Sequence, residues 1–219
     1  MSRKGKMMDN KNKELISKAI EFSKPYYQLP HRINGYHSWT HIQEGFSLYE
    51  KHFKGDLSEE CELAFYLAWI FHDIIYLGSS PNNEEESEKL FQLFCMKYNI
   101  NISKEFRGYV SELILCTKTH SPANSKNQDI KETSKILNDI DQAYLGYDFV
   151  NFMRKRALVR NDYIMYSDEE YKEGTILFCY QYLTQDFTFF TEKFQNLFQN
   201  NVFLNLNKYL DNLQKIEIN

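Results

Sequence analysis

Residues 63–77 read Leu-Ala-Phe-Tyr-Leu-Ala-Trp-Ile-Phe-His-Asp-Ile-Ile-Tyr-Leu, an apolar run with one polar dipeptide, His72-Asp73, in its second half. The run predicts a helix that is hydrophobic on every side, and such a helix belongs in the interior of a protein. A buried carboxylate costs several kcal/mol unless a charge or a metal compensates it. Imidazole and carboxylate together suit zinc, iron, manganese or nickel. We therefore expect a divalent cation beside Asp73.

The composition limits the classes of protein that the chain can represent. Its 219 residues fit one domain that is large enough to enclose an interior site. A formal charge of −4 offers no basic surface, which disfavours general nucleic-acid binding. No apolar stretch is long enough for a membrane span, and four widely spaced cysteines without a C-x-x-C pair predict reduced thiols. We expect a soluble, cytoplasmic protein without a membrane partner.

Helical periodicity covers nearly the whole chain, and only eight glycines and four prolines interrupt it. The predicted fold is all-α: a flexible N-terminus over residues 1–12, then a single domain of about eight to nine helices over residues 13–219. The helices are expected at about residues 11–28, 36–53, from a cap at 56 or 58 to 77, from 83 onward, 103–118, from a cap at 129 to 146, 147–165, 168–184 and 190–214. The apolar stretch from Phe194 to Leu213 fits either the domain's own core or a second copy, so a homodimer stays open.

Two further pairs of titratable residues are candidates for the same interior site. His37 and His41 stand four residues apart, a spacing that places both imidazoles on one face of a helix. Asp139 and Asp141 are acidic positions in an otherwise apolar helical pattern. Residues two apart differ by about 200° around a regular helix, so only one of the two carboxylates can face a shared metal.

The order His41, His72-Asp73, Asp141 resembles the H…HD…D pattern of the HD-domain metal-dependent phosphohydrolases. The flanking words resemble a bacterial group of predicted HD-type hydrolases: Tyr-His-Ser-Trp-Thr-His-Ile at 36–42, Trp-Ile-Phe-His-Asp-Ile-Ile-Tyr at 69–76, Asn-Glu-Glu-Glu-Ser at 83–87 and Asp-Ile-Asp-Gln-Ala-Tyr-Leu-Gly at 139–146. The first word is also similar to the Tyr-His-Asn-x-x-His motif of cyclic-nucleotide phosphodiesterases. The resemblance covers about residues 20–185.

The resemblance implies that His41, His72, Asp73 and Asp141 bind a divalent metal ion, with Mn, Ni, Co, Fe, Mg and Zn all open. Asp141 is preferred to Asp139 because Asp-Gln-Ala-Tyr-Leu-Gly matches the family's Asp-Leu-Ala-Ile-Leu-Gly, with Gln142 in place of the leucine. The implied reaction is hydrolysis of a phosphoester or phosphoanhydride by metal-activated water, in which Asp73 holds both metal and water. The implied substrate is a nucleotide or another small phosphorylated metabolite.

By similarity to the phosphodiesterases, His37 would protonate the leaving-group oxygen; the alternative is that it supports the site or lies at the surface. Glu85 or Glu84 would help to activate water, although an acidic first turn usually just complements the helix dipole. His120 would bind a second metal or the substrate, or would simply close a helix.

Three arginines are candidate phosphate ligands, because a guanidinium group recognises phosphate in a bidentate manner. They are Arg32 before the histidine helix, and Arg156 and Arg160 one turn apart. For Arg156 and Arg160 the alternative is an ion pair on the helix surface, with a partner such as Asp162.

Two rival functions stay open. The first is a regulatory module that keeps the four ligands and binds metal and nucleotide without turnover. The second is an HD-type oxygenase with two irons, for which His120 and a further carboxylate would have to become ligands.

Overall fold

The computed structural model describes residues 8–215, and within this range the chain forms nine α-helices, one short 3₁₀ helix and no strand. The elements are α1 (Asn10–Tyr27), α2 (Trp39–His52), α3 (Glu59–Phe71), α4 (Asn83–Lys97), α5 (Lys104–Cys116), α6 (Gln128–Gln142), η1 (Ala143–Gly146), α7 (Phe149–Asp162), α8 (Asp168–Leu183) and α9 (Glu192–Lys215). The prediction of an all-α fold with eight to nine helices is confirmed. Of the predicted flexible segment over residues 1–12, residues 1–7 lie outside the described residues, and α1 begins at Asn10.

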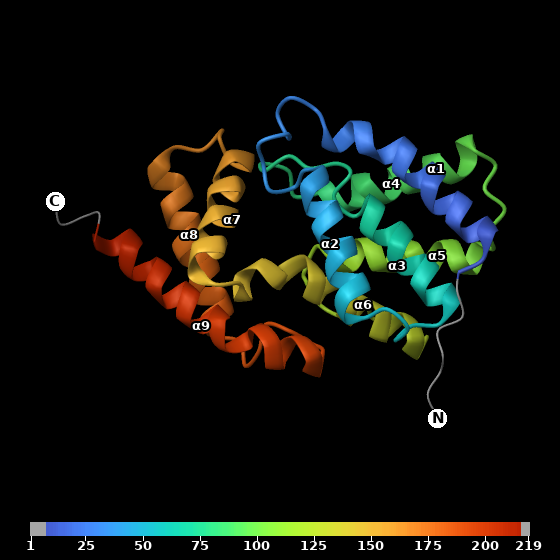
Figure 1. Ribbon diagram of the computed structural model, residues 1–219. Helices are drawn as coiled ribbons and strands as arrows, with labels where there is room; N and C mark the ends of the chain where they lie inside the picture. Colours follow the sequence, from blue (N-terminus) through green and yellow to red (C-terminus); the bar gives the residue numbers. More distant parts are fainter. Residues whose placement is uncertain (1–7, 216–219) are drawn as a thin grey trace.

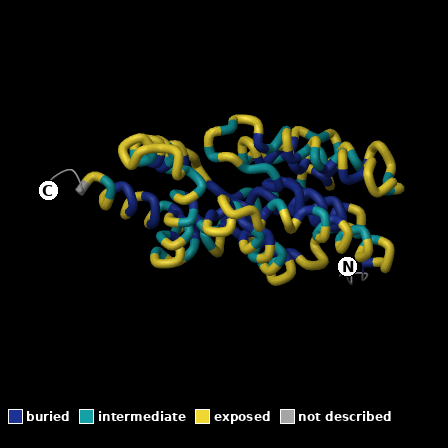
Figure 2. Tube along the Cα trace, turned by 90° about the horizontal axis from the view of Figure 1, so that it is seen from above, coloured by how far each residue is buried: buried dark blue, intermediate teal, exposed yellow. Residues whose placement is uncertain are grey.

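The helices form two groups (Figure 1). In the first group, α3 lies among its neighbours and packs against α1, α2, α4, α5 and α6. In the second, α7, α8 and α9 lie to one side of that bundle, and η1 leads the chain across to them. Helix α9 packs against η1, α7 and α8. Figure 2 shows the buried residues as a band through the middle of the molecule, with the exposed residues along the outer turns.

Helix α3 is buried over its whole length after the first two residues, from Cys61 to Phe71. It begins after Ser58, one of the two predicted caps, whose hydroxyl oxygen accepts the backbone N–H of Cys61 at 3.3 Å. The helix ends at Phe71, with His72 as its C-cap, so the prediction that it continues to residue 77 is wrong. Continuing apolar residues hide this end in the sequence, because hydrophobicity marks burial rather than backbone geometry.

The cap of α6 also differs from the prediction. Asn127, not Asp129, is the N-cap, and its side-chain oxygen accepts the backbone N–H groups of Asp129 and Ile130. Both are cap-forming residue types, so the local sequence does not choose between them. Helix α6 then tightens into η1, which extends the helical path to Gly146 as predicted.

The C-terminal stretch contributes to the chain's own core, because Phe194, Val202 and Leu206 are fully buried. All four cysteines are free and buried: Cys61, Cys95, Cys116 and Cys179. Burial raises the pKa of the Cys95 thiol to about 11 and that of Cys116 to about 12. None of the helices within residues 8–215 combines the length and the hydrophobicity that a bilayer crossing needs.

Helices α2 and α3 approach closely at Gly45. The Trp69 indole N–H donates to the backbone oxygen of Ile42 at 2.9 Å. A Cβ atom on Gly45 would lie only 2.0 Å from the Trp69 ring. The ring therefore lies directly against the backbone of α2, and its centroid is 5.0 Å from that of His41 and 4.4 Å from that of His72.

We expect Gly45→Ala to destabilise the fold by about 1–3 kcal/mol, since a methyl group there overpacks a filled core. Urea unfolding followed by circular dichroism measures the change. Gly108→Ala is the matched control, because an added Cβ at this exposed position of α5 meets nothing within 4 Å. Alanine in a helix interior should raise stability by about 0.5–1 kcal/mol. Equal stability of the two variants would contradict the close approach of α2 and α3.

Candidate metal centre

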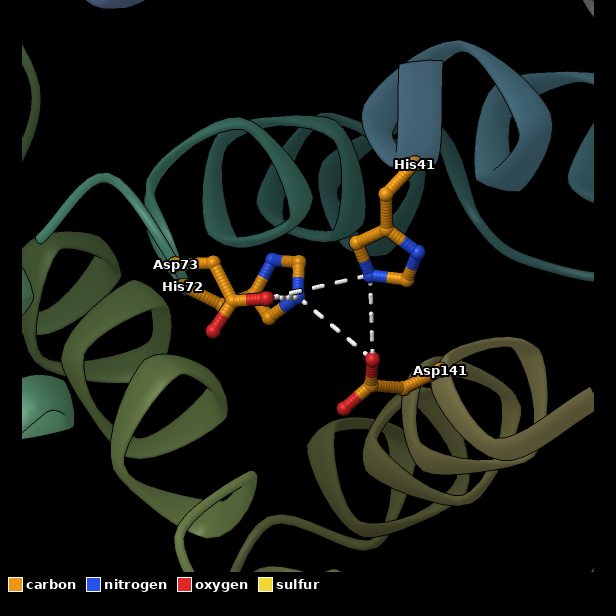
Figure 3. A group of neighbouring side chains, drawn as sticks. All are labelled: His41, His72, Asp73 and Asp141. Carbon is orange, nitrogen blue, oxygen red and sulfur yellow. Dashed lines mark hydrogen bonds and ion pairs between the residues drawn. The ribbon is translucent and has the colours of Figure 1, made fainter. Parts of the chain in front are cut away.

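Three segments bring the four predicted ligands together (Figure 3). His41 comes from the first turn of α2, His72 and Asp73 from the end of α3, and Asp141 from the last turn of α6. One ligand atom from each side chain lies within 4.8 Å of those from the other three, so the group could hold a metal ion. His72 is the C-cap of α3, still with helical backbone angles and with its N–H bonded to the Ala68 oxygen, and Asp73 follows directly after it.

The shortest contacts in the cluster join imidazole nitrogens to carboxylate oxygens. Asp141 Oδ1 lies 3.1 Å from His41 Nε2 and 3.6 Å from His72 Nε2. Asp73 Oδ2 lies 3.0 Å from His72 Nε2 and 3.8 Å from His41 Nε2. All four residues are at least nine-tenths buried. The two imidazole nitrogens and two carboxylate oxygens therefore face one small volume, as Figure 3 shows.

The tautomer of His72 is fixed by its backbone partner. Nδ1 lies 2.9 Å from the carbonyl oxygen of Trp69, and because a carbonyl only accepts, Nδ1 carries the hydrogen. Nε2 is buried and makes no hydrogen bond among the described residues. In the neutral ring this nitrogen presents a lone pair to the carboxylates of Asp73 and Asp141. Such an arrangement is stable only with a proton or a cation between them.

The charge states of the cluster suit a cation. Burial would raise the pKa values of Asp73 and Asp141, but the surrounding imidazoles outweigh it, so the pKa of each carboxyl lies below its usual range. Burial lowers the pKa of His41, against the effect of its hydrogen bond to Asp141. Burial also opposes charge on His72, but the two carboxylates raise its pKa well above the usual value. Ionised carboxylates and a neutral His41 are the states that metal binding requires, and a metal ion would displace the proton of His72.

Asp139 and Asp141 have different roles. Asp139 points away from the cluster, and its carboxylate accepts the backbone N–H groups of Phe190 and Thr191 at 2.7 and 2.8 Å and the Thr191 hydroxyl at 2.5 Å. It thereby anchors the segment that leads into α9, while Asp141 faces the ligands. Gln142, which stands where the family word has leucine, accepts a hydrogen bond from Tyr182 of α8 at 2.7 Å.

A cavity of about 1040 Å³ opens on the cluster. Asp73 and Asp141 line it from the bundle, and residues of α7 and α8 line the opposite wall. Tyrosines form much of its surface: Tyr36, Tyr76, Tyr144, Tyr163, Tyr166, Tyr171 and Tyr182. A volume of this size accommodates a nucleotide-sized ligand.

His37 lines this cavity and is held by a residue that the sequence analysis did not assign to it. Its Nδ1 lies 2.7 Å from Asp162 Oδ2, and its ring stacks on Tyr76 at 3.5 Å. The same carboxylate oxygen accepts the backbone N–H groups of Tyr36 and His37 at 2.9 and 3.2 Å. Asp162 is separated from His37 by 125 residues, and no local pattern links them. Asp162 was expected only as an ion-pair partner of arginines.

His120 is brought to the cluster, half-buried, with Nε2 3.2 Å from Asp141 Oδ2. Its φ of +46° lies in the left-handed region, which is uncommon for a residue with a side chain. Backbone strain of this kind clusters at functional sites. Asp141 thus contacts His41 and His72 through one oxygen and His120 through the other.

In the acidic first turn of α4, the glutamate that lines the cavity is not the one that was predicted first. Glu85 pairs with Lys118 and does not line the cavity. Glu84 lines it instead, and burial, together with the charge of Asp73, raises the pKa of its carboxyl. Of the two glutamates that the sequence left as alternatives, Glu84 is therefore the one that lines the cavity.

Two of the three predicted phosphate ligands do not line the cavity. Arg32 is buried and donates to the backbone oxygens of His37, Asp73 and Ile74, the last two at 2.7 and 2.8 Å. It orients the end of α3 rather than a substrate. Arg160 bridges α7 and α8, donating to the backbone oxygens of Tyr163 and Tyr166 and to Asp168.

Arg156 is the predicted phosphate ligand that lies in the cavity wall.

Comparison of the chain with protein-family models, curated proteins and solved structures gives no match. Function must therefore be inferred from the chemistry of the site.

We expect Asp141→Asn to weaken Mn²⁺ binding by about 100-fold or more, since loss of residues that only support ligands already costs about 10- to 100-fold. Isothermal titration of chelator-treated protein with Mn²⁺ measures the affinity. Asp139→Asn is the matched control: it should keep the wild-type affinity but lose about 1–3 kcal/mol of stability, because it disturbs buried hydrogen bonds. The reverse pattern would assign Asp139 as the ligand.

Proposed function

We propose that this protein is an HD-type metal-dependent phosphohydrolase, which cleaves a phosphoester or phosphoanhydride bond in a nucleotide or another small phosphorylated metabolite. The observation that carries the proposal is the buried Nε2 of His72, which lies 3.0 Å from an oxygen of Asp73 and 3.6 Å from one of Asp141, in a cluster that adjoins a large cavity. A divalent cation bound by His41, His72, Asp73 and Asp141 would supply Lewis acidity toward water and a phosphoryl oxygen.

In this proposal His37 is the general acid. Asp162 accepts its Nδ1–H, so Nε2 is the nitrogen left to carry a transferable proton. The hydrogen bond to Asp162 and stacking on Tyr76 fix the orientation of the ring. Once Nε2 has given its proton to the leaving-group oxygen, the ring returns to the neutral form. Asp162 is thus a positioning residue for His37.

Glu84 is the candidate for accepting a proton from the attacking water. Its carboxyl lines the cavity, and burial raises its pKa. A carboxylate with a raised pKa is a stronger base than an exposed one, which suits general base catalysis near neutral pH. Glu85 lacks this role because Lys118 neutralises it.

Colorimetric phosphate release from a panel of nucleotides and sugar phosphates, with Mn²⁺, Mg²⁺, Co²⁺ or Ni²⁺ in turn, tests the proposal. We expect turnover by the wild type and its abolition in Asp73→Ala, with the fold retained by circular dichroism. Asp211→Ala also removes one negative charge, but from an exposed position of α9 that does not line the cavity. It should leave turnover unchanged. Activity in Asp73→Ala equal to that of the control would refute the proposal.

We expect Asp162→Asn to lower kcat by about 100-fold, within the range that general acid–base catalysis contributes. The substitution alters the carboxylate that orients the His37 ring but leaves the four candidate metal ligands intact. Steady-state kinetics and Mn²⁺ titration together check this prediction. Loss of Mn²⁺ affinity in parallel with kcat would show a general structural effect instead.

A second candidate, the two-iron oxygenase, draws on the contact between His120 and Asp141 and on Glu84 in the same cavity. Two irons per chain with oxygen consumption would favour it. One divalent ion with phosphate release favours the hydrolase. Metal and nucleotide binding without release of phosphate from any compound in the panel would favour the regulatory module.

A further inference from the structure

Arg156 of α7 is a buried cation without an acidic partner among residues 8–215. Only 5% of its surface is exposed, yet it lines the same cavity as the metal centre. No carboxylate of the described residues forms an ion pair with it, and its Nε–H has no hydrogen-bond partner there. A buried charge without compensation costs several kcal/mol.

The other two arginines of the sequence analysis are satisfied. Arg32 donates to three backbone oxygens, and Arg160 pairs with Asp168. Arg156 has only neutral partners at long distances: the hydroxyl groups of Tyr144 at 3.5 Å, Tyr171 at 3.2 Å and Thr175 at 3.3 Å. Its guanidinium is the one of the three that keeps its charge available to a ligand.

The surroundings of Arg156 form a cradle for an oxyanion. The rings of Phe178 and Tyr209 lie 4.9 and 5.4 Å from the guanidinium carbon and hold the group in place. The hydroxyl groups of Tyr171 and Thr175 accept from Arg156, and Thr175 also hydrogen-bonds to Tyr171, so this pair keeps one hydroxyl hydrogen to donate to a ligand. One cation and one free hydroxyl donor thus meet on one wall of the cavity.

This cradle is distinct from the metal centre. The Tyr36 hydroxyl donates to the backbone oxygen of Asp141 at 3.2 Å, and the Tyr36 and Tyr144 rings pack 4.9 Å apart. The Tyr144 hydroxyl then contacts Arg156. Two tyrosine rings therefore stand between the metal ligands and the guanidinium, along the wall of one cavity.

We propose that Arg156, with Tyr171 and Thr175, binds a second acidic group of the substrate, so that the substrate class is a phosphorylated metabolite with two separated oxyanions. This inference rests on the proposed function for the reacting phosphate. The second oxyanion is a phosphate or a carboxylate, and both are recognised by the same charge-assisted hydrogen bonds. It stays bound while the first phosphate is hydrolysed at the metal centre.

The first experiment does not depend on turnover. Inorganic phosphate and, separately, acetate are titrated calorimetrically into the full chain in the presence of excess EDTA. We expect saturable binding of at least one of them, weakened about tenfold or more in Arg156→Met, since loss of one charge-assisted hydrogen bond is worth about that factor. Tighter phosphate binding assigns a phosphate as the second group; tighter acetate binding assigns a carboxylate.

Arg154→Met is the matched control, because it removes the same charge from an exposed position of the same helix. It should bind both anions like the wild type. Arg156→Lys keeps the positive charge and should retain binding, which covers the case in which the methionine variant fails to fold. No saturable binding by the wild type, or equal binding by wild type and Arg156→Met, overturns the proposal.

Thermal unfolding separates this role from a purely structural one. Phosphate or acetate should raise the Tm of the wild type and of Arg154→Met, because a ligand of the folded state stabilises it, and should leave the Tm of Arg156→Met unchanged. A structural arginine predicts a lower Tm for Arg156→Met together with an unchanged response to the anions. That result also overturns the proposal.

The second experiment tests the substrate class with the Mn²⁺-loaded protein. Adenosine 3′,5′-bisphosphate is compared with adenosine 5′-monophosphate, as kcat/KM where turnover occurs and as Kd where it does not. Arg156→Met should lose about tenfold or more on the bisphosphate and little on the monophosphate. Equal losses on both would refute a separate site. Absence of turnover with every substrate would refute the proposed hydrolase activity. The Kd values of wild type and Arg156→Met would then decide whether the anion site exists.

Discussion

Two ionised carboxylates and two imidazoles share the interior of this protein where α3 ends, and the charge that they place there must be balanced. The balance requires α2, α3 and α6 to stay in register, because Asp141 contacts both His41 and His72. The close approach at Gly45 and the hydrogen bond of the Trp69 indole hold α2 in place against α3 within the apolar core. Packing therefore fixes α2 against α3, and the polar contacts of Asp141 add α6.

Much of the fold follows from the sequence. Helical periodicity with few glycines predicted the helices, and the boundaries of α1, α2, α5, α7, α8 and α9 lie close to the expected ones. The main error concerns α3, which ends at Phe71, just before backbone oxygens that bond to a residue 41 positions earlier in the chain. Arg32 takes up the backbone oxygens of Asp73 and Ile74, and a window of apolar residues carries no information on such a partner.

The sequence also predicted some residues of the candidate site and missed others. The structure brings together His41, His72, Asp73 and Asp141, as the sequence predicted. Imidazole and carboxylate are ligand types for a divalent cation, and their burial is costly without one. Arginines were harder to place, because any arginine can bind an anion, a carbonyl group or a carboxylate. Asp162 was missed as the partner of His37, since the pair forms only through the tertiary fold.

The three hydrogen bonds of Arg32 have a consequence for dynamics. One guanidinium ties the carbonyl group of His37, in the segment between α1 and α2, to those of Asp73 and Ile74 after α3. Neither segment can move away from the other without breaking the bonds of Arg32 to Asp73 and Ile74. Amide hydrogen exchange in the two segments should accordingly report one cooperative unit, whose opening exposes His37 and Asp73 in a single event.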